Sequence, residues 1–217
     1  MASSRFWIHI YIAGLGALSL SLAALCLLTM PLPEESGVAI AAQLSIFAAI
    51  AYRFPIHFDV KSSIILDTSI IFASVLIFQP GVAMLLIVVG AMVGNASRDF
   101  EPEEMTFNIS QAALQAAAAG LLLYVIGWDY GAFAFDNGRI LLILAGSATT
   151  IYLTNTILVS IVIAFHTGMN PIRIWIQSAT RHDGIEQLGQ FALGAVAAIV
   201  GTSQPWALPI CSFPPSS

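Results

Sequence analysis

The residues of this chain best suited to chemistry are polar side chains inside long apolar stretches. Asp67 is the only acidic residue deep within such a stretch. Asn108, Gln111 and Gln115 recur at intervals of three and four residues, so they share one face of a predicted helix. Asn155 lies among threonines in a later stretch. A carboxyl group and carboxamides gathered between helices would form a small ligand-binding or signal-sensing cavity.

A purely structural role for the same residues is the alternative. Hydrogen bonds between membrane helices stabilise their packing by about 0.6–2 kcal/mol per pair without any ligand. Asp67 is the strongest functional candidate, because a carboxylate within lipid requires a partner or water. The sequence leaves both interpretations open.

No pattern in the chain is typical of an enzyme active site or a metal centre. A single His-Asp pair occurs at 182–183, and the other histidines are scattered. Cys26 and Cys211 form neither a disulfide framework nor a pair of metal ligands. No apolar stretch combines a nucleophile with a base. We therefore expect a protein that is not an enzyme and has no metal or cofactor.

The composition identifies the solvent in which these residues must be positioned. Hydrophobic residues make up 58% of the chain and charged residues 9%, and the mean hydropathy is +0.88. Soluble domains carry roughly 25% charged residues, so this chain has too few charges to cover its surface in water. A net charge of −5 gives no support for nucleic-acid binding. The expected partner is the lipid bilayer, and the expected fold class is all-α, a polytopic helical membrane bundle.

Hydropathy predicts about seven transmembrane helices, several of them near the ~20 residues that cross a bilayer. A Pro-Gly turn at 80–81 separates the third from the fourth. The predicted spans are 7–30, 37–53, 62–79, 81–95, 105–128, 140–165 and 185–202. They make up a transmembrane domain over residues 1–202, which is followed by an irregular tail over 203–217.

The distribution of lysine and arginine predicts the side of the membrane that each loop occupies. With a cytoplasmic N-terminus, six of the seven basic residues lie inside and only Arg139 lies outside. The outer loops are then 31–36, the turn at Pro80, 129–138 and the stretch after Gly201. We expect a multi-pass protein of the bacterial cytoplasmic (inner) membrane.

Small residues form ridges on two of the predicted helices. Gly90 and Gly94 fit a close helix-packing motif on the fourth span, and Ala13 and Ala17 form a similar ridge on the first. Such ridges pack within one subunit or join two copies. A homodimer therefore remains one of two possibilities.

Three segments resemble a known family. They are Phe107–Tyr124 (FNISQAALQAAAAGLLLY), the hairpin Ile64–Arg98 that ends in VGNASR, and the segment PWALPI that ends at Ile210. They are similar to the multi-span N-terminal domains of bacterial HD-GYP phosphohydrolases and related GGDEF signalling proteins. The resemblance implies a membrane input or anchoring domain, whose last span leads into a cytoplasmic cyclic-dinucleotide output domain.

The chain departs from that family at its C-terminus. After Pro209 the expected apolar run is replaced by ICSFPPSS, and two adjacent prolines remove two backbone donors in succession. We expect an incomplete eighth span that starts at Trp206 and was truncated by a frameshift or a premature stop. The output domain would then be missing.

Two functions remain open at this stage. The first is a sensory or anchoring module of a cyclic-dinucleotide signalling protein. The second is the substrate-binding membrane component of a small-molecule, vitamin-type uptake transporter. A reading frame that continues into a phosphohydrolase would favour the first, and neighbouring ATPase and scaffold subunits would favour the second.

Overall fold

The computed structural model describes residues 2–54, 56–59, 62–64, 66–96, 100–130, 138–179 and 183–204. Within these ranges the predicted helical fold class is confirmed, with one short antiparallel strand pair in addition. The helices are Ala2–Thr29 (α1), Glu35–Arg53 (α2), Asp67–Ile77 (α3), Pro80–Asn95 (α4), Pro102–Val125 (α5), Gly138–Thr167 (α6), Pro171–Ala179 (α7) and Asp183–Ser203 (α8), and the strands are Ile56–Asp59 (β1) and Ser62–Ile64 (β2). The predicted start of an eighth span at Trp206 lies outside the described residues.

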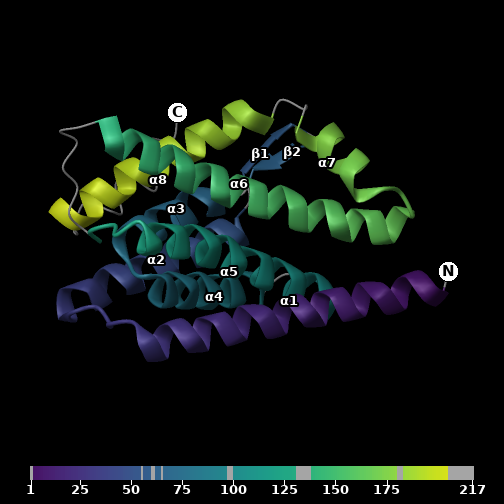
Figure 1. Cartoon of the computed structure of the whole chain (residues 1–217), viewed down its shortest axis with the longest axis horizontal. Coiled ribbons are helices and arrows are strands. Elements are labelled where there is room, and N and C mark those ends of the chain that lie inside the picture. Colours follow the sequence, from purple (N-terminus) through teal and green to yellow (C-terminus); the bar gives the residue numbers. More distant parts are fainter. Residues whose placement is uncertain are drawn as a thin grey trace.

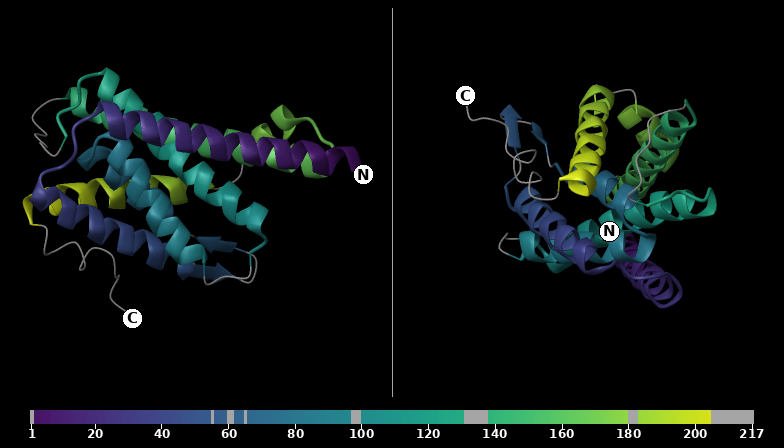
Figure 2. Two further views of the ribbon diagram at one scale, coloured as in Figure 1. Left: turned by 90° about the horizontal axis from the view of Figure 1, so that it is seen from below. Right: turned by 90° about the vertical axis from the view of Figure 1, so that its left-hand side faces the viewer.

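The long helices lie along one axis of a bundle (Figure 1). Helices α6 and α8 lie on one side of the molecule and α1 on the opposite side, as the end-on view in Figure 2 also shows. Helix α7 is a short element between α6 and α8 that hydropathy did not predict. It starts at a proline, where the Asn170 side chain caps the helix by accepting a hydrogen bond from the Ile172 N–H (2.8 Å).

Helix α3 forms the centre of the bundle. Nine of its 11 residues are buried, and it packs against α2, α4, α5, α6 and α8. At 1.5 Å per residue it is about 16 Å long, far shorter than the ~30 Å hydrocarbon core. The prediction of a continuous third span over 62–79 is therefore wrong, because Ser62–Ile64 pairs as a strand with Ile56–Asp59. Hydropathy averaged over a long window does not separate this three-residue strand, Ser-Ser-Ile, from the apolar helix that follows it.

Four helices of the described part are long and apolar enough to cross a membrane, judged by length and composition. These segments are Arg5–Thr29, Glu35–Arg53, Pro102–Val125 and Gly138–Thr167. Helices α3 and α4 are apolar but shorter, and α8 carries Glu186, Gln187 and Gln190 in its first turns. Seven full-length transmembrane helices are thus not supported.

The closest helix contact involves the two glycines of α4. A Cβ atom on Gly90 would lie 2.4 Å from the Ala48 Cβ of α2, and one on Gly94 would lie 2.5 Å from the Ala49 carbonyl oxygen. Real Cβ atoms do not approach this closely, so α4 can lie this near α2 only with glycine at both positions. This small-residue ridge packs within the chain.

The lateral surface of the bundle is apolar. Large side chains on α1 and α6 are turned outward, including Leu20 (69% exposed), Leu28 (86%) and Leu142 (75%). By contrast, most residues of α3 and α4 are buried, and 11 of the 24 residues of α5 are buried as well. A protein that exposes so much apolar surface has a lipid or protein environment around it.

Candidate functional site

Asp67 is positioned by the start of α3 and by α2. Its Oδ2 atom accepts a hydrogen bond from the Tyr52 hydroxyl (3.2 Å), and its Oδ1 atom accepts one from the Thr68 backbone N–H (2.8 Å). An acidic side chain in the first turn of a helix is also stabilised by the partial positive charge of the helix terminus. Asp67 thus has partners on α2 and α3, and the arrangement explains how its polar group is accommodated in the bundle.

The polar residues predicted on one face of α5 lie in three different environments. The Gln111 Nε2 atom donates a hydrogen bond to the Asn155 Oδ1 atom of α6, so the structure brings these two predicted residues together. Gln115 is buried, and its Oε1 atom has no hydrogen-bond partner. Asn108 lines a pocket at one end of the bundle. Residues on one helix face therefore meet different neighbours along its length.

The ridge on α1 is turned outward. Ala13 and Ala17 are exposed, and a Cβ atom on the adjacent Gly14 would meet nothing within 4 Å. The other side of the helix, near Gly16, approaches Ser110 of α5. Unlike the glycines of α4, these small residues are not used in packing within the described chain.

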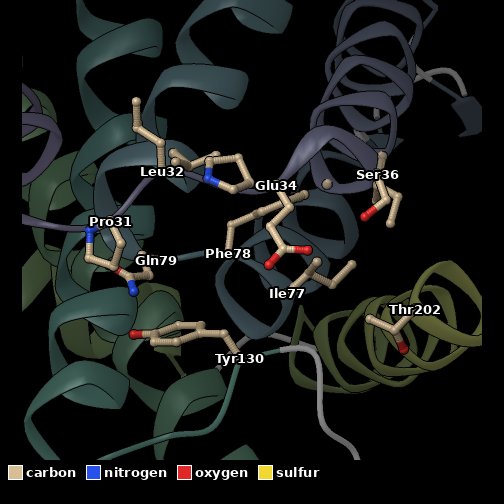
Figure 3. Close-up of a pocket in the computed structure, with 13 residues that line it drawn as sticks. Pro31, Leu32, Glu34, Ser36, Ile77, Phe78, Gln79, Tyr130 and Thr202 are labelled. Atoms are coloured by element: carbon tan, nitrogen blue, oxygen red, sulfur yellow. The ribbon is translucent and has the colours of Figure 1, made fainter.

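A pocket of about 390 Å³ opens at the end of the bundle where α1 meets α2 (Figure 3). We call it the Glu34 pocket. It is formed by the α1–α2 loop and first turns of α2, the junction of α3 and α4, the turn after α5, and the end of α8. Its lining residues are Pro31, Leu32, Pro33, Glu34, Ser36, Gly37, Ile40, Ile77, Phe78, Gln79, Val82, Tyr130 and Thr202.

Hydrogen bonds fix two of the polar side chains of the Glu34 pocket. The Tyr130 hydroxyl donates to the Gly120 carbonyl oxygen (3.3 Å). Burial raises the pKa of the Tyr130 phenol from 10.0 to about 12, so the phenol stays a hydrogen-bond donor to a higher pH than an exposed tyrosine would. The Thr202 hydroxyl is within hydrogen-bonding distance of the Ala198 and Ile199 carbonyl oxygens (3.1 and 3.0 Å). Both hydroxyl protons are thus directed to the backbone.

Glu34 and Gln79 supply acceptors that are not used in this way. Glu34 is the N-cap residue of α2, yet its side chain makes no capping hydrogen bond. Figure 3 shows its carboxylate directed into the pocket, near Ile77 and Phe78. The Gln79 Oε1 atom is buried without a hydrogen-bond partner. Buried acceptors are normally paired, so the unpaired Gln79 oxygen has the capacity to accept a hydrogen bond.

A second pocket, of about 370 Å³, is lined by other helix ends. It lies between the start of α1, the start of α5 and the end of α6, and its polar lining includes Glu101, Glu103, Glu104, Asn108 and His166. Beside it, the His9 Nδ1 atom lies 3.0 Å from the Glu103 Oε1 atom, and both side chains are about half exposed. The described residues contain no group of three or more His, Cys, Asp or Glu side chains placed to hold a metal ion.

Sequence reasoning did not select the residues of the Glu34 pocket. Glu34, Gln79, Tyr130 and Thr202 each belong to one of the four segments that were predicted as outer loops. The signal that would have found them is their shared side of the membrane, because loops on one side of a bundle meet at one end. They lie in predicted loops, whereas the predicted site residues are polar residues within the predicted spans.

Comparison with protein-family models, with curated proteins and with solved structures found no match to this chain.

Proposed function

We propose that this chain is a seven-pass membrane domain that serves as the sensory or anchoring module of a cyclic-dinucleotide signalling protein. It lies in the bacterial cytoplasmic membrane with its N-terminus in the cytoplasm. The signalling role follows from the resemblance, and one observation supports the membrane arrangement. The four loops that the charge distribution assigns to the outer side meet in a single pocket at one end of the bundle.

The burial pattern of the bundle supports a multi-pass arrangement in spite of its short helices. Helix α3 is surrounded by other helices and so does not need the length that contact with lipid would demand. The outward faces of α1 and α6 carry large apolar side chains that suit the acyl chains of a bilayer. We therefore count α3, α4 and α8 as passes whose polar or short parts are shielded by protein.

Reporter fusions test this arrangement. Fusions after Ser36 and after Gly138 are expected to give an external signal, whereas fusions after Phe58 and after Thr180 are expected to give a cytoplasmic one. The reason is the bias of basic residues toward one set of loops. A paired periplasmic-active enzyme and cytoplasm-fluorescent protein would report each position twice. A cytoplasmic signal after Ser36 would reject the layout and, with it, an outward-facing Glu34 pocket.

The second candidate, a substrate-binding subunit of an uptake transporter, is equally consistent with the outward ridge on α1. Exposed small residues such as Ala13 and Ala17 let another helix approach closely. In a signalling module that helix belongs to a second copy of the chain, and in a transporter it belongs to a scaffold subunit. The two functions therefore predict different partners for the same surface.

A further inference from the structure

We propose that the Glu34 pocket binds a small primary amine that carries an apolar body. The inference rests on the proposed function only for the side of the membrane from which the ligand enters. The chemistry of the ligand follows from the charge, the hydrogen-bonding groups and the apolar wall of the pocket itself.

The charge of the lining favours a cationic ligand. Among the described residues of the lining, Glu34 is the only one with a carboxylate, and none of them is a lysine, arginine or histidine. Its carboxylate is directed into the pocket and is not used to cap α2. A cationic group entering the pocket would gain a charge-assisted hydrogen bond, whereas an anionic group would meet a like charge.

The lining also contains several hydrogen-bond acceptors. The hydroxyl protons of Tyr130 and Thr202 are directed to backbone carbonyl oxygens, so each of these lining groups has only its oxygen lone pairs left for a further hydrogen bond. The Gln79 Oε1 atom is a buried acceptor without a partner. The Ser36 hydroxyl and the Gln79 amide N–H groups are donors in the same lining, so the preference for an ammonium group, which has three N–H donors and no acceptor, rests chiefly on the Glu34 carboxylate.

The N-terminus of α2 is a feature of the described lining that would attract an anion. Its first backbone N–H groups receive no side-chain cap, and a helix N-terminus carries roughly half a positive charge. Glu34 and Glu35 stand at this terminus and place two negative side chains against that partial charge. The balance of charge at the mouth of the pocket therefore remains negative.

The inner wall of the pocket is apolar. Ile40, Ile77, Phe78 and Val82 are each less than 9% exposed and form the inner wall of the pocket. A volume of about 390 Å³ lies at the small end of the range for ligand sites. The aromatic ring of Phe78, near the Glu34 carboxylate in Figure 3, adds a surface that favours a neighbouring cation. An aryl- or alkyl-amine of modest size fits both the Glu34 carboxylate and the apolar inner wall.

Calorimetric titration of the purified full chain in lipid nanodiscs tests the proposal. The probes are 2-phenylethylamine, 2-phenylethanol and 3-phenylpropanoate, which are similar in size and are cationic, neutral and anionic at neutral pH. Empty nanodiscs correct for partition into lipid. We expect the amine to bind about threefold more tightly than the alcohol, since Glu34 is exposed and an ion pair with an exposed carboxylate contributes up to about 1 kcal/mol. The carboxylate is expected not to bind.

Two neighbouring glutamates provide a matched pair of variants. Glu34→Gln is expected to remove the preference for the amine over the alcohol, whereas Glu35→Gln, whose side chain does not line the pocket, is expected to keep it. Gln79→Met is expected to weaken amine binding by removing the unpaired acceptor. Equal binding of amine and alcohol, equal effects of the two glutamate variants, or no amine binding up to millimolar concentration would each overturn the proposal. These outcomes leave the result of the reporter fusions unaffected, so a wrong ligand class and a wrong topology are distinguishable.

Discussion

At the scale of residues, some intramembrane polar groups have hydrogen-bond partners and others do not. Gln111 and Asn155 satisfy one another across the α5–α6 contact, and Asp67 is satisfied by Tyr52 and Thr68. This pattern favours a structural role for these residues. The acceptors that lack partners in the Glu34 pocket are a different group, contributed by loops and helix ends.

The Gln111–Asn155 pair is expected to stabilise the fold. Gln111→Leu and Asn155→Leu should each lower the free energy of unfolding by about 1 kcal/mol, because each leaves the other carboxamide without its partner. The double variant should lose less than the sum of the two. Denaturant unfolding in detergent micelles gives the free energy of unfolding of the original protein, the two single variants and the double variant. Thr149→Val, on the exposed face of α6, is the control and should change little. Strictly additive losses would show that the pair does not interact.

At the scale of elements, the α2–α4 contact depends on two glycines, and a substitution there has a predictable cost. Gly90→Ala is expected to destabilise the protein by roughly 1–3 kcal/mol, because its Cβ atom would lie 2.4 Å from that of Ala48. Gly14→Ala is the matched control. It adds a methyl group on α1 where nothing lies within 4 Å, so it should stabilise the helix by roughly 0.5–1 kcal/mol. Thermal unfolding of both variants provides the measurement, and equal transition temperatures would contradict the packing that we describe.

At the scale of the whole molecule, the outward face of α1 is the surface on which a second copy would pack. In a background with Cys26→Ala and Cys211→Ser, we expect Ala17→Cys to form a disulfide-linked homodimer on mild oxidation in membranes. Ile12→Cys should not, because that side chain is buried within the chain. A monomer at both positions would reject a homodimer through this face and favour the transporter alternative. The readout is the mass on a non-reducing gel.

The sequence by itself determined that the chain is helical and where several helices begin and end. The predicted fourth and sixth spans, 81–95 and 140–165, differ from Pro80–Asn95 and Gly138–Thr167 by two residues or fewer at each end. These boundaries are local. A proline is tolerated in the first turn of a helix, and an apolar run ends where polar or turn residues begin. Hydropathy did not predict the start of α3, which follows a short strand, or the existence of α7, which is a short amphipathic helix.

Only the tertiary structure decided which side chains meet. The period of a helix places Asn108, Gln111 and Gln115 on one face, but the neighbour of each depends on the position of α6 along α5. The Glu34 pocket likewise depends on segments that are far apart in the sequence, from residue 31 to residue 202. Sequence can assign these segments to one side of a membrane by their charge. The packing of α3 against α2, α4, α5, α6 and α8 brings their ends together, because the position of each helix end is fixed by the helices that it contacts.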